Sequence, residues 1–104
     1  MWIYVVSDFS STGKGRNAKK LFHLELEKDG FLKLNANLFV RYCSSMTNAK
    51  MHKERIKKKL FANSRISIIF VLDKQNDYSY HFYGRKRYKN YPQELKSLPF
   101  VEFF

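Results

Sequence analysis

The chain has 104 residues, which suffice for one hydrophobic core but not for two, and its 44% hydrophobic and 17% aromatic content excludes intrinsic disorder. Twenty Lys and Arg against nine Asp and Glu give a net charge of +11, so we expect a polyanionic partner, with nucleic acid favoured over an anionic membrane surface. The lone Cys43 excludes an internal disulfide, no apolar run reaches the roughly 18 residues of a membrane span, and no signal peptide is evident, so we expect a soluble cytoplasmic protein without membrane contact.

The first half of the chain predicts a strand, a helix and a second, longer strand. Residues 2–8 are rich in aromatic and β-branched residues, which is typical of a buried strand. Residues 13–29 are predicted to form a helix, in which Glu25 is partly exposed or paired with a cation. Residues 31–42 alternate as a strand that bends or splits near residues 34–37. The apolar face of the helix is predicted to comprise Leu21, Phe22, Leu24 and Leu26.

The second half predicts one more helix and several strands. Residues 46–62 are predicted to form the helix, with Ser44, Ser45 and Thr47 as candidate N-caps. Residues 65–72 are an apolar run, which indicates a strand buried on both faces. A polar turn at residues 73–77 precedes a shorter strand at 78–83. Beyond Gly84 the chain is strongly basic, and residues 98–104 are predicted to form one more short strand.

This order predicts an α+β fold of the ferredoxin-like βαββαβ type, with two helices over one face of a four-stranded sheet and an extra C-terminal strand. Residues 1–84 are assigned to this domain and residues 85–104 to a basic tail. A sheet with apolar residues on both faces favours a two-fold homodimer. The apolar side chains of the last strand are predicted to dock on a partner: Leu98, Phe100, Val101 and Phe103.

Asp8 is the candidate catalytic and metal-binding residue, because it is an acidic side chain at the end of the first buried strand. A carboxylate suits Mg²⁺, which prefers oxygen ligands and often takes only one or two from protein. One carboxylate is a poor metal site, whereas two copies facing each other across a dimer axis would form a better one. The alternative interpretation is an Asx-type turn with Ser10 or Ser11 that merely ends the strand.

Four cations follow Asp8 and are predicted to bind the phosphates of a nucleic acid: Lys14, Arg16, Lys19 and Lys20. They lie at and just after the predicted N-terminus of a helix, where backbone N–H groups favour anions. The Gly-Lys-Gly in this loop does not make a phosphate loop of nucleotide triphosphatases. That motif requires a further glycine upstream and Ser or Thr after the lysine.

Two other patterns carry weaker signals. His23, His52 and His81 are not in zinc-ligand spacing and are interpreted as packing or surface residues. Residues 78–91 mix aromatic and basic side chains, which could stack on single-stranded nucleic acid. A strand followed by a solvated basic tail is favoured over stacking. The RNA-recognition module shares the predicted topology, but its glycine-containing strand motif is absent from the sequence.

Four segments resemble the small CRISPR-associated protein 2 family of adaptation proteins, in the form found beside single-effector DNA-targeting systems. They are Ile3-Tyr-Val-Val-Ser-Asp8-Phe, Glu27-Lys-Asp-Gly-Phe31, Phe39-Val-Arg-Tyr-Cys43 and Ile68-Ile-Phe-Val-Leu-Asp-Lys-Gln75. Their order and spacing fit over residues 1–84. The sequence departs from its relatives at Asn35 and Asn37, where Gln and Ser are usual, and in its longer tail.

The resemblance implies a ferredoxin-like homodimer with Asp8 at the dimer axis. It also implies CRISPR spacer acquisition, in which the dimer bridges integrase subunits and serves as a ruler and cationic platform for duplex DNA. The leading hypothesis is therefore this structural role in antiviral defence. The alternatives are a Mg²⁺-dependent endoribonuclease or DNase that uses paired Asp8 residues, and a non-catalytic ferredoxin-like module that binds RNA.

Overall fold

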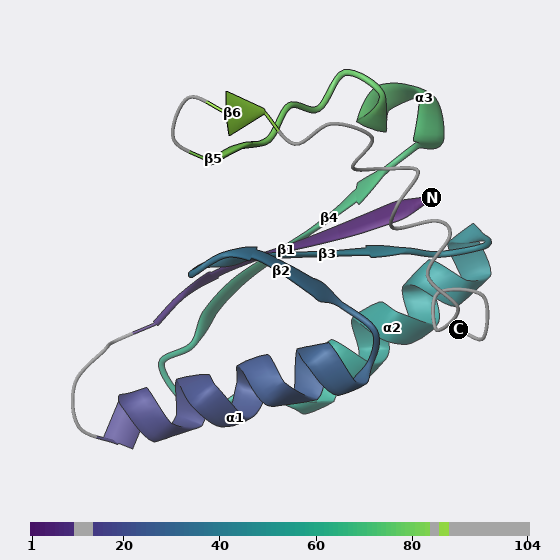
Figure 1. Ribbon diagram of the computed structural model, residues 1–104. Coiled ribbons are helices and arrows are strands. Elements are labelled where there is room, and N and C mark those ends of the chain that lie inside the picture. The colour runs from purple at the N-terminus through teal and green to yellow at the C-terminus, as the bar shows by residue number, and fades with distance from the viewer. Residues whose placement is uncertain (10–13, 84–85, 88–104) are drawn as a thin grey trace.

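A four-stranded antiparallel sheet, with two helices packed on one face, forms the centre of the computed structural model, which describes residues 1–9, 14–83 and 86–87 (Figure 1). Its strands lie in the order β2-β3-β1-β4, and the chain order is β-α-β-β-α-β as predicted. In the described ranges, no helix is long and apolar enough to cross a membrane. The elements of the sheet layer and the helical layer are β1 (Trp2–Asp8), α1 (Lys14–Lys28), β2 (Leu32–Asn35), β3 (Leu38–Tyr42), α2 (Met46–Lys58) and β4 (Arg65–Val71).

Strand β1 is central and pairs with two neighbours. Trp2 lies opposite Tyr42 of β3 and opposite Val71 of β4, so the three strands share one register at this end. Successive side chains of a strand point to opposite faces, and β1 therefore contributes to both sides of the sheet. On the helical side Ile3 and Val5 are fully buried, whereas Trp2 and Tyr4 belong to a second apolar cluster on the opposite face.

The apolar face of α1 is narrower than predicted. Phe22 and Leu26 are each 3% exposed and pack on the sheet, whereas Leu21 is 65% and Leu24 is 50% exposed. Each residue of an α-helix is rotated by about 100° from the one before it, so these two leucines lie away from the line of Phe22 and Leu26. The prediction that they belong to the buried face is wrong.

Helix α2 starts where the sequence predicts. Ser45 is its N-cap, and the Ser45 hydroxyl accepts a hydrogen bond from the Asn48 N–H at 3.1 Å. The helix ends at Lys58 rather than at residue 62, because the chain turns toward β4 through Asn63, whose φ is 64°. The buried stripe of α2 contains His52, which is fully buried and agrees with its interpretation as a packing residue.

The long second strand is split, as predicted, into β2 and β3. Between them the Asn37 N–H donates to the Asn35 side-chain oxygen at 2.9 Å, and the Asn37 carbonyl accepts the Ser7 N–H at 2.8 Å. The two asparagines thus shape a turn rather than alternate along one continuous strand. The same turn supports the end of β1.

The described chain from β4 onward differs more from the prediction. β4 is an edge strand, and Ile69 is 48% exposed on the face away from α1 and α2, so the expectation of burial on both faces is wrong. The polar turn is the short helix α3 (Asp73–Asn76). Only Phe82–Tyr83 (β5) of the next predicted strand is extended, and it pairs with β6 (Lys86–Arg87) outside the main sheet. The predicted last strand and the boundary at residue 84 lie outside the described residues.

Asp29, just after α1, ties the two helices together. Its carboxylate contacts His52 Nδ1 at 2.6 Å and accepts from Arg55 at 2.9 Å, while its backbone carbonyl accepts from the buried Arg41 at 2.8 Å. Burial alone would raise the pKa of Asp29, but the hydrogen bonds and charges of His52 and Arg55 outweigh it and lower that pKa.

We expect Asp29→Asn to lower the free energy of unfolding by about 2 kcal/mol at pH 7, because it removes the charged acceptor of a fully buried histidine. Since the folded-state pKa is lowered, this stabilisation is present above the pKa of the unfolded chain and is lost as the pH falls through the folded pKa. Urea unfolding of both proteins at several pH values checks this. The difference should shrink below about pH 4, the usual range of Asp.

Glu54→Gln is the matched control, since Glu54 forms an exposed ion pair with Lys53 at 3.5 Å. Exposed pairs contribute about 0.5 kcal/mol or less. An equal loss of stability in the two variants would show that Asp29 is not the link between the helices.

Candidate functional site

Asp8 ends β1 on the sheet face that points away from the two helices. The strand alternates strictly, so Asp8 shares this face with Trp2, Tyr4 and Val6. Asp8 is exposed, and in the register of the sheet it lies opposite Arg65 of β4, which is also exposed. Side chains directly opposite each other on neighbouring strands lie close together. The carboxylate therefore has a cation as its cross-strand neighbour, which the sequence analysis did not identify.

Ser7 points to the other face and is 1% exposed. Its hydroxyl lies 3.4 Å from Nε2 of His23 and is enclosed under α1, so it is shielded from solvent. Burial lowers the pKa of His23, and the charges of Lys33 and Lys19 lower it further, against a small opposing effect of Glu27. This keeps His23 neutral near pH 7, in agreement with its interpretation as a packing residue.

The cations predicted to bind phosphates lie on α1, which packs on the face of the sheet opposite to Asp8. Lys14 is the first residue of α1, while Arg16 and Lys20 are exposed one turn apart and therefore lie on one face of the helix. Lys19 is half-buried next to them. Lys33, on the edge strand β2, is a further exposed cation. Its charge, like that of Lys19, lowers the pKa of His23. Its position between Leu32 and Leu34 on an alternating strand was the signal that could have identified it.

The sheet face that carries Asp8 is partly closed at the Tyr4 end. At the closed end the Tyr4 hydroxyl donates to the Asn76 side chain of α3 at 2.5 Å, and the His81 ring stacks on Tyr4 with centroids 6.2 Å apart. Burial is the main reason why the pKa of Tyr4 is raised. The face still exposes apolar side chains and is called the open face below: Val6, next to Asp8 on this face, is 39% exposed, and Ile69, opposite Tyr4 on β4, is 48% exposed.

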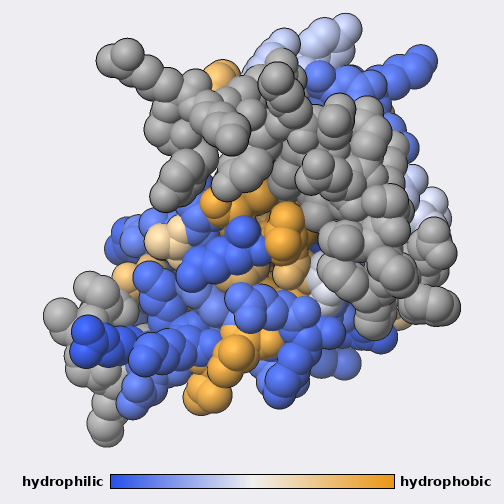
Figure 2. Space-filling view, viewed as in Figure 1, coloured by the Kyte–Doolittle hydropathy of each residue, from blue (hydrophilic) through white to orange (hydrophobic). Residues whose placement is uncertain are grey.

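Figures 1 and 2 show the helical layer and the sheet from the same side. The helical layer below the sheet is covered largely by hydrophilic residues, whereas hydrophobic residues gather above it at the level of the sheet. Leu32 on β2 is a further apolar residue of the open face, at 37% exposure. Exposed apolar surface beside an edge strand is typical of a face that another protein covers.

The metal chemistry of the site depends on Asp8 alone within one chain. In the parts of the chain that the structure describes, no three His, Cys, Asp or Glu side chains cluster as a metal site. An exposed carboxylate at a strand end still fits Mg²⁺, which keeps several waters and takes its remaining ligands from one or two carboxylates and from substrate phosphates. Asp8 could thus supply one oxygen ligand to such an ion.

The four predicted docking residues of the last strand, Leu98, Phe100, Val101 and Phe103, lie outside the described residues and stay a prediction. Cys43 is fully buried next to Arg41. Burial raises the pKa of the Cys43 thiol against the opposing charge of Arg41. A thiol that is buried and protonated in this way is a packing residue, not a nucleophile.

Known proteins supply the last piece of evidence. No protein-family model matches the chain. The CRISPR-associated endoribonuclease Cas2 of Flavobacterium psychrophilum is 33% identical over 87 residues, which are 83% of this chain and 76% of the relative. The protein of the same description from Parvibaculum lavamentivorans is 28% identical over 84% of this chain and 87% of its own length. A Cas2 of Rhodospirillum rubrum is 32% identical over 58% of this chain and 54% of its own length. Identity at this level over most of both chains, on a βαββαβ fold, shows that the chain belongs to the CRISPR-associated Cas2 family.

Proposed function

We propose that the chain is a spacer-acquisition subunit of CRISPR antiviral defence, of the form found beside single-effector systems. Two copies form a homodimer that binds duplex DNA and bridges integrase subunits. The observation that carries this proposal is the exposed apolar sheet face that carries Asp8, together with the cations of α1 and β2 on the helical side of the sheet. An apolar face needs a partner, and a net charge of +11 needs a polyanion.

The dimer follows from the composition of the open face. Val6, Ile69 and Leu32 are each more than a third exposed on one side of the sheet, although they are apolar. A two-fold axis through this face would bury the same residues twice, because a C₂ interface uses one patch on both subunits. Asp8 lies on that face, so the same axis would bring two Asp8 carboxylates toward each other.

The proposed nucleic-acid surface consists of cations on the helical side of the sheet. Arg16 and Lys20 are exposed on one side of α1, and Lys33 lies on the adjacent edge strand. Each cation that neutralises a phosphate releases condensed counterions, so this group supports duplex binding without reading sequence. In a two-fold dimer the group is present twice, at a fixed separation, which is the geometry that a ruler for duplex DNA needs.

A second candidate function is phosphodiester cleavage, favoured by the Asp8–Arg65 pairing and by relatives described as endoribonucleases. Paired Asp8 carboxylates would hold Mg²⁺, which supplies positive charge to the scissile phosphate. Arg65 would hold a non-bridging phosphate oxygen next to it. Duplex DNA and RNA are both candidate substrates for this chemistry.

Asp8→Asn separates the two functions. Because Asp8 is exposed, the substitution should change the free energy of unfolding by less than about 0.5 kcal/mol. In an integration assay with the neighbouring integrase and a prespacer duplex, we expect spacer insertion to continue near the wild-type rate. Mg²⁺-dependent cleavage of RNA or DNA should disappear.

Each outcome of this experiment decides one claim. If the wild-type protein neither co-purifies with the integrase nor supports insertion, the acquisition role is wrong. Cleavage that persists in Asp8→Asn would remove Asp8 from any nuclease site. Loss of insertion in Asp8→Asn, with an unchanged dimer, would show that the acid is needed for acquisition as well.

Salt dependence tests the DNA surface. For the double variant Arg16→Ala/Lys20→Ala, the slope of log K against log salt should fall by about 0.9 for each lost phosphate contact, close to 2 in total. The matched control is Lys50→Ala/Lys57→Ala, which removes the same charge from exposed positions of α2. Fluorescence anisotropy with a labelled duplex at several salt concentrations gives both slopes. Equal losses in the two variants would mean that binding follows net charge alone, without a defined surface.

A further inference from the structure

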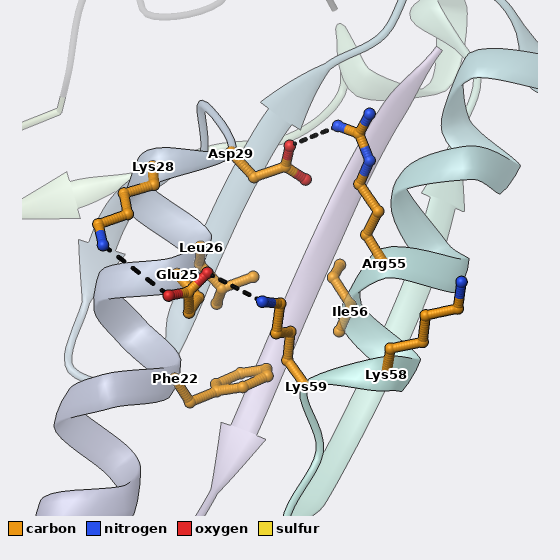
Figure 3. A pocket seen from close by; sticks show the side chains of 9 residues that line it. All are labelled: Phe22, Glu25, Leu26, Lys28, Asp29, Arg55, Ile56, Lys58 and Lys59. Atoms are coloured by element: carbon orange, nitrogen blue, oxygen red, sulfur yellow. Dashed lines mark hydrogen bonds and ion pairs between the residues drawn. The ribbon is translucent and has the colours of Figure 1, made fainter.

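A groove runs along the seam between α1 and α2, on the side of the molecule that does not carry Asp8. It consists of two adjoining hollows of about 300 and 240 Å³, which share Phe22, Glu25 and Lys59. Figure 3 shows the larger hollow, with Phe22 and Leu26 of α1 and Ile56 of α2 forming its floor. Nothing in the proposed dimer or DNA surface makes use of this seam.

The two ends of the groove differ in chemistry. The smaller hollow is lined by Ala18, Leu21 and Phe61, and its Leu21 is 65% exposed. The larger hollow is bordered by Lys28 and Arg55 at its far end, and Lys58 lines it beside Lys59 (Figure 3). An occupant therefore meets an exposed leucine at one end and several cations at the other.

The acids of the groove are already neutralised. Glu25 lies between Lys28 at 3.9 Å and Lys59 at 3.3 Å, and Asp29 accepts from Arg55 at 2.9 Å (Figure 3). The larger hollow thus has four cations against two paired carboxylates. The remaining positive charge attracts an anionic group, and the surrounding aliphatic stems of Lys and Arg tolerate apolar neighbours.

The spacing of the two ends sets the size of the occupant. Leu21 and Lys28 are seven residues apart on one helix, which corresponds to about 10 Å along its axis. An amphipathic helix with a bulky apolar residue at one position and carboxylates two turns away matches this distance. Helices that pack in a groove present side chains at such i, i+4 and i+7 positions.

We propose that the α1–α2 groove is a docking site for an acidic amphipathic helix of a partner protein. The helix places an apolar side chain against Leu21 and Phe61 and carboxylates against Lys28, Arg55 and Lys58. A nucleic acid backbone would satisfy the cations but would leave Leu21 exposed. The exposed leucine is what favours a protein partner over a second nucleic acid.

The test uses a labelled 18-residue helical peptide with leucines at i and i+4 and glutamates at i+7 and i+11 on one face. A peptide of the same composition, scrambled so that these residues lie on different faces, is the reference. We expect the first peptide to bind about tenfold more tightly in fluorescence anisotropy at physiological salt, since burying one leucine accounts for such a factor.

Two matched pairs of variants locate the binding. Leu21→Gln should lower the affinity for the peptide about tenfold. Leu24→Gln, at an exposed leucine outside both hollows, should change this affinity less than about twofold. Lys28→Gln should also lower the affinity for the peptide, whereas Lys50→Gln, at an exposed lysine of α2 outside both hollows, should leave it unchanged. Circular dichroism confirms that all four variants are folded, which is expected because the four side chains are exposed.

Three results would overturn the proposal. One is equal binding of the two peptides, and another is an equal effect of the two leucine variants. The third is displacement of the peptide by a duplex DNA, if the affinity for this DNA falls in the Lys28→Gln variant but not in the Leu21→Gln variant. That pattern would identify the groove as a second nucleic-acid surface. None of these results bears on Asp8 or on the open face.

Discussion

The two-residue alternation of the central strand β1 is the constraint on which the other features depend. Ile3, Val5 and Ser7 point toward the helices, so Tyr4, Val6 and Asp8 must point to the opposite face. A shift of one residue would bury Asp8 in the apolar core and would expose Val5. The large cost of burying an unpaired carboxylate excludes that register. Asp8 is therefore fixed on the open face by the same hydrophobic pattern that builds the core.

This division gives the two faces of the sheet different roles. The helical face is closed, and Asp29 joins α1 to α2 through His52 and Arg55. On the opposite face Asn76 and His81 contact Tyr4, whereas Ile69 beside Tyr4 is exposed. This face also carries Asp8 next to the exposed Val6, and its exposed apolar residues suit a second copy. The proposed dimer and any cleavage would use this face, whereas the proposed DNA surface would use the cations on the helical side.

Much of the fold could be predicted from the sequence because local signals were consistent. The bounds of β1, the N-cap at Ser45 and the split near residues 34–37 follow from alternation and turn chemistry. The burial of β4 could not be predicted, because an apolar run does not show that a strand lies at an edge. The short helix α3 was missed because its stabilising contact, from Asn76 to Tyr4, spans 72 residues.

The candidate site could be predicted in part. Asp8 and the α1 cations were apparent from their positions next to a strand end. Arg65 and Lys33 were not apparent. Arg65 becomes a neighbour of Asp8 only through the register of β1 and β4, and Lys33 becomes a neighbour of the α1 cations only through the packing of β2 beside α1. Their sequence distance from Asp8 carries no signal of this proximity. The apolar face of α1 was predicted too broad, because residue type alone does not locate the contact line between helix and sheet.

The central claim is that the open sheet face forms a two-fold interface that brings two Asp8 residues together. Cross-linking of Asp8→Cys with a short bismaleimide tests it most directly, because the native Cys43 is fully buried and should not react. Lys50→Cys, exposed on the outer side of α2, is the reference position. The account predicts a covalent dimer for Asp8→Cys and none for Lys50→Cys. A dimer in solution that cross-links at position 50 but not at position 8, or a chain that stays monomeric, would contradict it.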